Sequence, residues 1–292
     1  MDPAELKNNL ETLEWQIAMG ADEAIGDEAI DWFSRSGEQI AAKAAKAVNQ
    51  QKNETVPVLA NVARTPPGTA SAVASSQDEV GDARKLAASC NSIDELLAAL
   101  ENFDACQLSR TATNLCFIDG NRQAEILLIG EAPGRDEDIQ GKPFVGRSGQ
   151  LLDKILSAID LSRNNESPDN SVLISNTVFW RPPGNRKPTE AETLVCLPFV
   201  NKLIELVAPK FIVCLGATPS QRLTGETKGI TRLRGRWFDH TIGPGTSGDD
   251  EKPKSAALLA TLHPSYLLRQ PMQKKLAWRD FLALKLKVAS PD

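Results

Sequence analysis

Histidine and tyrosine are scarce in this sequence of 292 residues, which contains two His, one Tyr and three Met. Chemistry that needs an imidazole can therefore draw only on His240 and His263. The single tyrosine, Tyr266, lies three residues after His263 in the segment His-Pro-Ser-Tyr. This scarcity reduces the candidates for catalysis or metal binding by histidine to two positions.

Cysteine is also infrequent, and its spacing argues against two common uses. An odd number of widely spaced cysteines without a secretory signal does not suggest a disulfide framework. No two of them form a CxxC pair, so neither a zinc knuckle nor a thioredoxin-like redox site has direct support. The five are Cys90, Cys106, Cys116, Cys196 and Cys214.

Long hydrophobic runs are missing as well. No stretch approaches the roughly 20 apolar residues of a membrane span, and the acidic N-terminus lacks a signal-peptide pattern. The composition, 41% hydrophobic and 24% charged, is ordinary for a globular protein. We therefore expect a soluble, cytoplasmic protein.

The formal net charge of −5 is unevenly distributed. Residues 1–90 hold 8 Lys/Arg and 14 Asp/Glu, whereas residues 91–292 hold 25 and 24. Two stretches are basic: 176–236 has 10 basic and 4 acidic residues, and 263–287 has 6 and 1. Such stretches suit an anionic surface such as nucleic acid, although lysines on solvated helix faces give the same counts.

The composition divides the chain into three parts. Residues 1–35 contain an expected amphipathic helix over 4–19, whose apolar face could dock on the main domain, on itself or on a protein partner. That face consists of Leu6, Leu10, Leu13 and Ile17. Residues 36–90 are rich in Ala, Ser, Gln, Thr and Pro and poor in large apolar residues, so we interpret them as a low-complexity linker. Residues 91–292 are expected to form the main domain.

Within the main domain, short apolar strands alternate with helices. The expected strands are Glu125–Gly130, Ser171–Asn176, Lys210–Gly216 and Ala256–Leu262. Apolar strands separated by helices indicate a parallel sheet covered on both faces. The sequence therefore predicts an α/β fold, a three-layer sandwich with a central, mostly parallel four-stranded sheet, preceded by a helical or disordered extension.

Polar side chains follow the carboxyl ends of three of these strands, where open α/β sheets bind their ligands. The first strand runs into Gly130-Glu131-Ala132-Pro133-Gly134, the second ends at Asn176, and the last is followed by His263. A carboxylate, a carboxamide and a scarce histidine are therefore expected to converge on one edge of the sheet.

Other segments near this edge suit a nucleic-acid ligand. Phe144 lies in a glycine-flanked turn and offers a ring for stacking on a base. Arg181 and Arg186 belong to a Pro- and Gly-containing loop that is stiff and basic, as a phosphate-binding loop should be. A plain connecting loop is the alternative.

Two further segments add basic and apolar side chains. Arg232, Arg234 and Arg236 alternate along a run that we expect to be extended, which would place three guanidinium groups on one side. The residues after His263 offer apolar wedges and a phosphate partner. These are Leu267, Leu268 and Arg269.

Taken together, these segments resemble the uracil-DNA glycosylase superfamily, most closely its family 4, whose members usually carry an iron–sulfur cluster. The matching segments, in the same order over about 103–287, are GEAPGRDEDIQGKPFVGRSGQLLDKIL (130–156), NTVFWRPPGNRKPTEAE (176–192), ITRLRGRWF (230–238) and HPSYLLRQP (263–271). The resemblance implies a monofunctional DNA glycosylase. It would flip deoxyuridine out of DNA, hydrolyse its N-glycosidic bond and leave an abasic site in base-excision repair. The alternatives are a glycosylase for another deaminated base such as hypoxanthine and a non-catalytic uracil- or DNA-binding protein.

The resemblance also implies roles for individual residues. Glu131 matches the acidic residue that positions water or supports the sugar cation, and His263 the histidine that stabilises charge on departing uracil. Three residues match the uracil pocket. The backbone at Ala132 would contact uracil, the ring of Phe144 would stack on the base, and the side chain of Asn176 would read the base edge. The expected DNA contacts, from the basic loops and this match, are Arg181, Arg186, Arg232, Arg234, Arg236, Tyr266, Leu267, Leu268 and Arg269.

The cysteines depart from the family-4 pattern, which has CxxC near the start, a Cys just before Arg-Pro-Pro and one on the following helix. Cys106 and Cys196 fit the second and fourth positions, but Phe103 and Trp180 occupy the first and third. A four-iron cluster normally takes four cysteine ligands, so we expect no cluster and no other cofactor. The alternative is a cluster in which Cys116 or Cys90 substitutes for a missing ligand. Phe103 and Trp180 are expected to fill the vacated space as a hydrophobic plug.

The resemblance implies a partner and a location as well. The expected partner is uracil-containing DNA, and no membrane contact is expected. We expect a monomer that works in the cytoplasm of a bacterium, where its substrate is the DNA of the nucleoid.

Overall fold

The structure, a computed structural model, describes residues 69–243 and 254–290. The helix expected over 4–19 and most of the linker expected over 36–90 lie outside these ranges. The described residues belong to one compact unit, Pro66–Asp292. Within the described ranges, no helix combines the length and the apolar character that crossing a membrane requires.

In the described residues, six strands form one mixed sheet in the order β1-β3-β2-β4-β6-β5. Its four parallel strands are β3 (Val172–Asn176), β2 (Ile126–Gly130), β4 (Phe211–Leu215) and β6 (Ser255–Thr261). The antiparallel edge strands are β1 (Ile118–Gly120) and β5 (Trp237–Thr241). The expected parallel strands are thus confirmed as the centre of a wider sheet. Both edge strands escaped prediction because they are short or half-exposed and lack a continuous apolar run.

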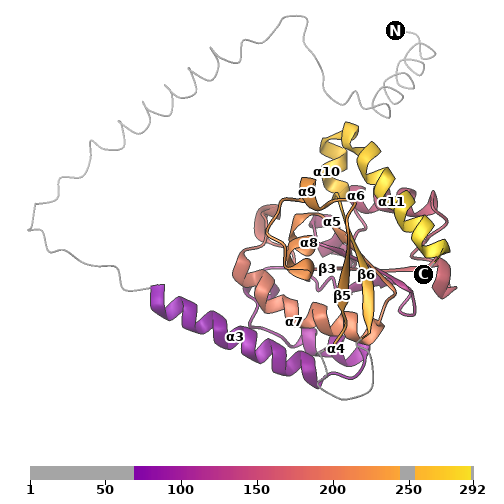
Figure 1. The fold of residues 1–292 in the computed structure, drawn as a ribbon. Helices are drawn as coiled ribbons and strands as arrows, with labels where there is room; N and C mark the ends of the chain where they lie inside the picture. The colour runs from indigo at the N-terminus through magenta and orange to yellow at the C-terminus, as the bar shows by residue number, and fades with distance from the viewer. Residues whose placement is uncertain (1–68, 244–253, 291–292) are drawn as a thin grey trace, which may run out of the picture. The chain divides into compact units, whose positions relative to one another are not determined.

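Helices surround the sheet, as Figure 1 shows. The α-helices are α3 (Thr69–Ser89), α4 (Ile93–Glu101), α5 (Arg135–Gln140), α6 (Arg147–Ser157), α7 (Glu190–Val207), α8 (Ala217–Thr224), α9 (Ile230–Leu233), α10 (Pro264–Arg269) and α11 (Lys274–Ala289). Short 3-10 helices are η1 (Gln107–Arg110), η2 (Pro168–Asn170), η3 (Pro183–Asn185) and η4 (Pro271–Gln273).

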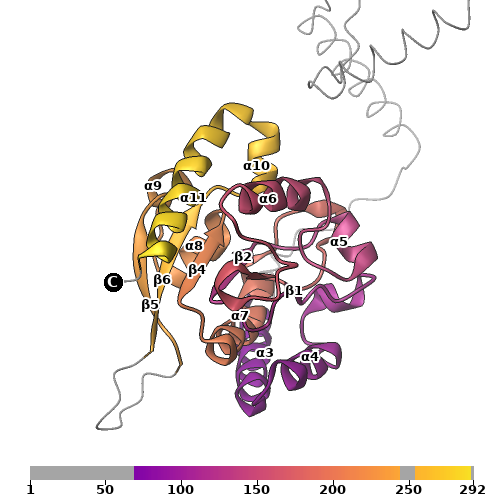
Figure 2. The same cartoon turned by 90° about the vertical axis from the view of Figure 1, so that its right-hand side faces the viewer.

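The sheet separates two hydrophobic cores. Neighbouring residues of a strand face opposite sides. Leu127 and Ile129 of β2 therefore pack in the core that includes residues of α4 and α7, and Leu128 packs in the core that includes residues of α6 and α11. Figure 2 shows α3, α4 and α7 on one side of the strands and α6 and α11 on the other. The expected three-layer α/β architecture is confirmed.

Helix α3 occupies the last part of the segment that we interpreted as a linker. It packs against α7, and Ala83 and Ala87 are buried in the core together with Cys90. The segment lacks large apolar residues, but alanine has the highest helix propensity, and its small side chain lets two helices approach closely. The composition therefore predicted a linker where residues 69–89 form a helix.

Candidate active site

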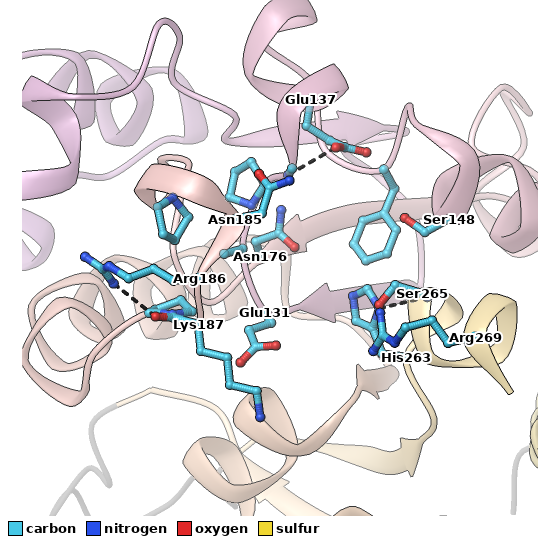
Figure 3. A pocket seen from close by; sticks show the side chains of 16 residues that line it. Glu131, Glu137, Ser148, Asn176, Asn185, Arg186, Lys187, His263, Ser265 and Arg269 are labelled. Carbon is cyan, nitrogen blue, oxygen red and sulfur yellow. Dashed lines mark hydrogen bonds between the residues drawn. The ribbon is translucent and has the colours of Figure 1, made fainter. Parts of the chain in front are cut away.

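A cavity of about 400 Å³ opens at the carboxyl edge of the sheet (Figure 3). The turn after β2, the end of β3 and the segment after β6 each contribute to its wall, because parallel strands end on the same side. The residues from the sequence analysis that line it are Glu131, Ala132, Phe144, Asn176, Arg186, His263 and Arg269. Their roles remain predictions, but the structure brings these residues to one site.

Asn176, the last residue of β3, is the best-buried polar group of the cavity, with 1% of its surface exposed. It pairs in register with Gly130 of β2. A Cβ atom at Gly130 would lie 2.4 Å from Asn176 Oδ1 and 2.6 Å from the Phe144 ring, so only glycine leaves room for both side chains. Among the buried side-chain atoms of the described residues, Asn176 Oδ1 is the one that lacks a hydrogen-bond partner.

An unpartnered buried oxygen of this kind is costly, at about 1–3 kcal/mol. Native proteins rarely keep such a group without a reason, and a ligand that supplies the missing donor is one. Asn176 Oδ1 lines a cavity, so it is placed to accept a hydrogen bond from a ligand N–H.

His263 caps the N-terminus of α10, and its capping bond defines the position of its proton. The Ser265 backbone N–H donates to His263 Nδ1 at 3.1 Å, and Ser265 Oγ lies 2.9 Å from the same atom. A ring nitrogen that accepts a hydrogen bond carries no proton, so a neutral ring has its proton on Nε2. Desolvation, aided by the positive charge of Arg269, lowers the pKa of His263 to about 4. At neutral pH, His263 is therefore an uncharged donor.

Phe144 forms one wall of the cavity in a strained backbone conformation. Its φ of 55° lies in the left-handed region, which is costly for a residue with a side chain. Arg163 donates from Nη1 to the Pro143 carbonyl at 3.0 Å and from Nη2 to the Phe144 carbonyl at 2.9 Å. A Cβ atom at Gly149 would lie 1.8 Å from that Phe144 oxygen, so glycine is needed there. The ring centroid of Phe144 lies 5.4 Å from that of His263.

Glu137 joins the two turns that border the cavity. Its carboxylate accepts backbone N–H bonds from Gly134 at 3.1 Å, Val145 at 3.0 Å and Gly146 at 2.9 Å. The sequence analysis missed this residue. Its place three residues after Gly134, at the start of a helix, is the usual position of a capping carboxylate and could have identified it.

Glu131 directs its carboxylate toward the cavity (Figure 3). The hydroxyl of Thr218, in the first turn of α8, donates to Glu131 Oε1 at 2.7 Å. Lys187 lines the same cavity. Thr218 and Lys187 were not singled out from the sequence, because strand order places the residues after β4 and the loop after β3 near this edge but does not show which of their side chains reach the cavity or Glu131.

The loop after β3 holds its two arginines in fixed positions. Arg186 forms a forked bond with Glu192, from Nη1 at 2.9 Å and from Nη2 at 2.6 Å. Arg181 donates from Nε to Asn185 Oδ1 at 2.7 Å, with Asp138 at 3.8 Å. Paired arginines of this kind are oriented in advance, which reduces the entropy lost when they bind a phosphate.

The expectation that Arg232, Arg234 and Arg236 alternate on one extended run is wrong. Arg232 belongs to the short helix α9, and Gly235, with a φ of 73°, turns the chain before β5 begins. Arg234 forms an ion pair with the buried carboxylate of Asp280, and its guanidinium also donates to the Leu276 carbonyl at 2.7 Å. Arg234 therefore compensates a buried charge and is not free for DNA.

Leu267 was expected to be an apolar wedge, but it is fully buried with Leu262 and Ala277. This expectation overlooked that the segment is helix α10, in which adjacent residues face different directions. Leu268, the next residue, is 41% exposed and remains the candidate wedge. Tyr266 is half-buried, and Arg269 is exposed.

A family model described as the uracil DNA glycosylase superfamily matches residues 117–286. The chain therefore belongs to the uracil DNA glycosylase superfamily. It is 34% identical over 194 residues to the type-4 uracil-DNA glycosylase of Archaeoglobus fulgidus, covering 65% of this chain and 90% of that protein. The identity to the Thermotoga maritima protein of the same name is 39% over 166 residues, covering 56% and 77%. The resemblance to family 4 is confirmed.

The thiols of this chain do not fit the iron–sulfur cluster that is usual in family 4. Cys106 and Cys196 are buried, with their Sγ atoms 4.0 Å apart. Phe103 and Trp180 are buried in the same core, and the Phe103 ring centroid lies 4.9 Å from that of Phe199. In the part of the chain that the structure describes, no group of three or more His, Cys, Asp or Glu could hold a metal. Two thiolates and two aromatic rings are not the ligand set of a four-iron cluster.

Proposed function

We propose that this protein is a uracil-DNA glycosylase, which flips deoxyuridine out of DNA and hydrolyses its N-glycosidic bond. The product would be an abasic site, for completion by base-excision repair. Membership of the superfamily makes the chain a monofunctional DNA glycosylase. The observation that supports uracil over cytosine is the unpartnered Oδ1 of Asn176 in a cavity of base-binding size, and the assay below distinguishes uracil from hypoxanthine.

Uracil offers the donor that Asn176 lacks. Its N3–H would donate to Oδ1, and the amide NH₂ of the same side chain would donate to a uracil carbonyl. Cytosine has an acceptor at N3. Asn176 Oδ1 would therefore face the lone pair of cytosine N3, and this buried oxygen would remain without a donor. Sites built to hydrogen-bond a polar group reject analogues that lack it much more strongly than apolar pockets do. Phe144 would stack on the face of the flipped base.

Cleavage of the N-glycosidic bond leaves positive charge on the sugar and negative charge on uracil. The neutral His263 has its Nε2–H available as a donor to the developing uracil anion. The carboxylate of Glu131 would stabilise the sugar cation and orient the water that attacks C1′. That water supplies hydroxide to the sugar, and the remaining proton neutralises the released uracil.

DNA binding would bring the deoxyuridine to this cavity through the residues at its rim. Lys187 and Arg269 line the cavity and carry positive charge for the phosphates, and Arg186 lines it with its guanidinium paired to Glu192. Leu268 is the exposed apolar side chain that would enter the stack as the base leaves it. We retain the prediction of a monomer as part of this proposal.

The proposed activity predicts that the protein converts uracil-containing duplexes into alkali-labile products. We expect strand breaks after alkali with a U:G duplex, and none with a lesion-free duplex or without alkali. The measurement is a denaturing gel of end-labelled oligonucleotides, with a hypoxanthine duplex alongside. Breaks at hypoxanthine but not at uracil would indicate the other deaminated base, and binding without breaks would indicate a non-catalytic protein.

We also propose that the enzyme works without an iron–sulfur cluster. Protein purified anaerobically is expected to contain far less than one iron atom per chain and to lack absorbance near 400 nm. The Phe103→Cys/Trp180→Cys variant, which restores four cysteines, is expected to gain that absorbance after reconstitution with iron and sulfide. Adding Cys196→Ser to this variant is the matched control and should remove the gain. Stoichiometric iron in the unaltered protein would contradict the proposal.

A further inference from the structure

Thr218 is the one side chain that donates a hydrogen bond to Glu131 within the described residues. Its Oγ1 lies 2.7 Å from Glu131 Oε1, in the range of charge-assisted hydrogen bonds. The two residues are 87 positions apart in the sequence and come from different strand ends, the turns after β2 and β4. Because Glu131 lines the cavity, this bond determines how the carboxylate faces a ligand.

The segment that carries Thr218 also packs against the other predicted catalytic residue. Gly216, directly before α8, has a φ of 104°, and its N–H donates to the Thr261 carbonyl at 2.9 Å. A Cβ atom at this position would lie 3.2 Å from the Cβ atom of His263. The start of α8 is thus in contact with His263 through Gly216 and with Glu131 through Thr218.

A carboxylate without such a bond would have an alternative partner. Lys187 lines the same cavity, on the side to which Glu131 points (Figure 3). If Glu131 turned to this ammonium group, its oxygens would be less available to water or to a sugar cation. The Thr218 bond occupies Oε1 and leaves Oε2 for the reaction.

We propose that Thr218 is a positioning residue for the glycosylase reaction: its hydroxyl holds Glu131 so that the second carboxylate oxygen faces the attacking water and the sugar. This inference rests on the proposed function and adds a residue that acts through Glu131 without touching the substrate. A hydrogen bond to a charged group is worth enough to predict a loss of about 10- to 100-fold in rate when the donor is removed.

The test compares Thr218→Val, which keeps the shape but removes the hydroxyl, with Thr218→Ser, which keeps the hydroxyl. Single-turnover excision of uracil from a duplex with enzyme in excess separates the chemical step from binding. We expect Thr218→Val to be about 10- to 100-fold slower with an unchanged Kd for the DNA, and Thr218→Ser to stay within about threefold of the unaltered enzyme. Thermal unfolding of each variant shows whether the fold is kept.

The coupling to Glu131 is tested in the Glu131→Gln background. There we expect Thr218→Val to cause no further loss, because the carboxylate that it positions is gone. An equal loss in both backgrounds, or a Thr218→Val enzyme as fast as the unaltered one, would overturn the inference. So would a Thr218→Ser enzyme as slow as Thr218→Val. An unaltered enzyme that does not excise uracil would instead overturn the proposed function.

Discussion

Replacing Asn176 with alanine is expected to slow uracil excision by roughly 100- to 1000-fold. The substitution removes the acceptor for uracil N3–H and the donor for a uracil carbonyl. Asn176 is 1% exposed, so the hydrogen bonds that it would make to the base lie at a buried position of the cavity wall. The measurement is the single-turnover rate on a U:G duplex, with the release of free uracil followed directly.

The control for this prediction separates base recognition from folding. Asn201→Ala, on an exposed position of α7, changes the same kind of side chain far from the cavity and should leave the rate unchanged. Asn176→Ala should retain the affinity for lesion-free DNA, because phosphate contacts come from other residues. An Asn176→Ala enzyme within tenfold of the unaltered rate, with its fold intact, would exclude the base-reading role.

The convergence of Glu131, Asn176 and His263 could be predicted from the sequence because it follows from strand order. Short apolar runs separated by helices indicate parallel strands, and parallel strands place their carboxyl ends on one edge. No side-chain contact is needed for this inference, which is why it succeeds from a single sequence. The edge strands β1 and β5, which carry no continuous apolar run, lie beyond the reach of the same argument.

What the sequence could not supply are contacts between distant segments. Arg234 pairs with Asp280, 46 residues away, and Thr218 with Glu131, 87 residues away. Local spacing made Arg234 look like one of three equivalent arginines, whereas tertiary packing gives it a buried partner. A pattern of charges therefore identifies a basic segment but not which of its members are free to bind an anion.

The strained conformation of Phe144 is a second feature that local rules would not suggest. A left-handed backbone at a non-glycine residue persists only where its surroundings hold it. Here Arg163, which is 9% exposed, donates to the carbonyls of Phe144 and of the residue before it and is neutralised by Asp119 and Asp153. Such strain concentrates at functional sites, which agrees with a ring that must keep its place while a base enters and leaves.

The second large effect is expected at His263, where alanine should reduce the rate of excision by roughly 100- to 1000-fold, as for the loss of an oxyanion donor. The working form is the neutral ring, because its pKa is lowered to about 4 by desolvation and by Arg269. With respect to His263, the rate should therefore be constant from pH 8 down to about 5 and fall only as pH approaches 4. A surface histidine would titrate near pH 6.5 instead. The measurement is a pH profile of single-turnover rates.

A substitution of Arg269 tests the direction of the pKa shift of His263. Its positive charge disfavours the imidazolium, so Arg269→Gln should raise the pKa of His263 and move the acid-side fall toward higher pH. The free energy of unfolding should depend on pH in the same direction. The contribution of His263, buried as the neutral ring, is fully present above about pH 6.5 and is lost as pH falls toward 4. His240→Gln is the matched control, since the other histidine lies outside the cavity and should leave rate and profile unchanged. A profile that falls with a midpoint near 6.5 and does not move in Arg269→Gln would show that His263 does not act as a buried neutral donor.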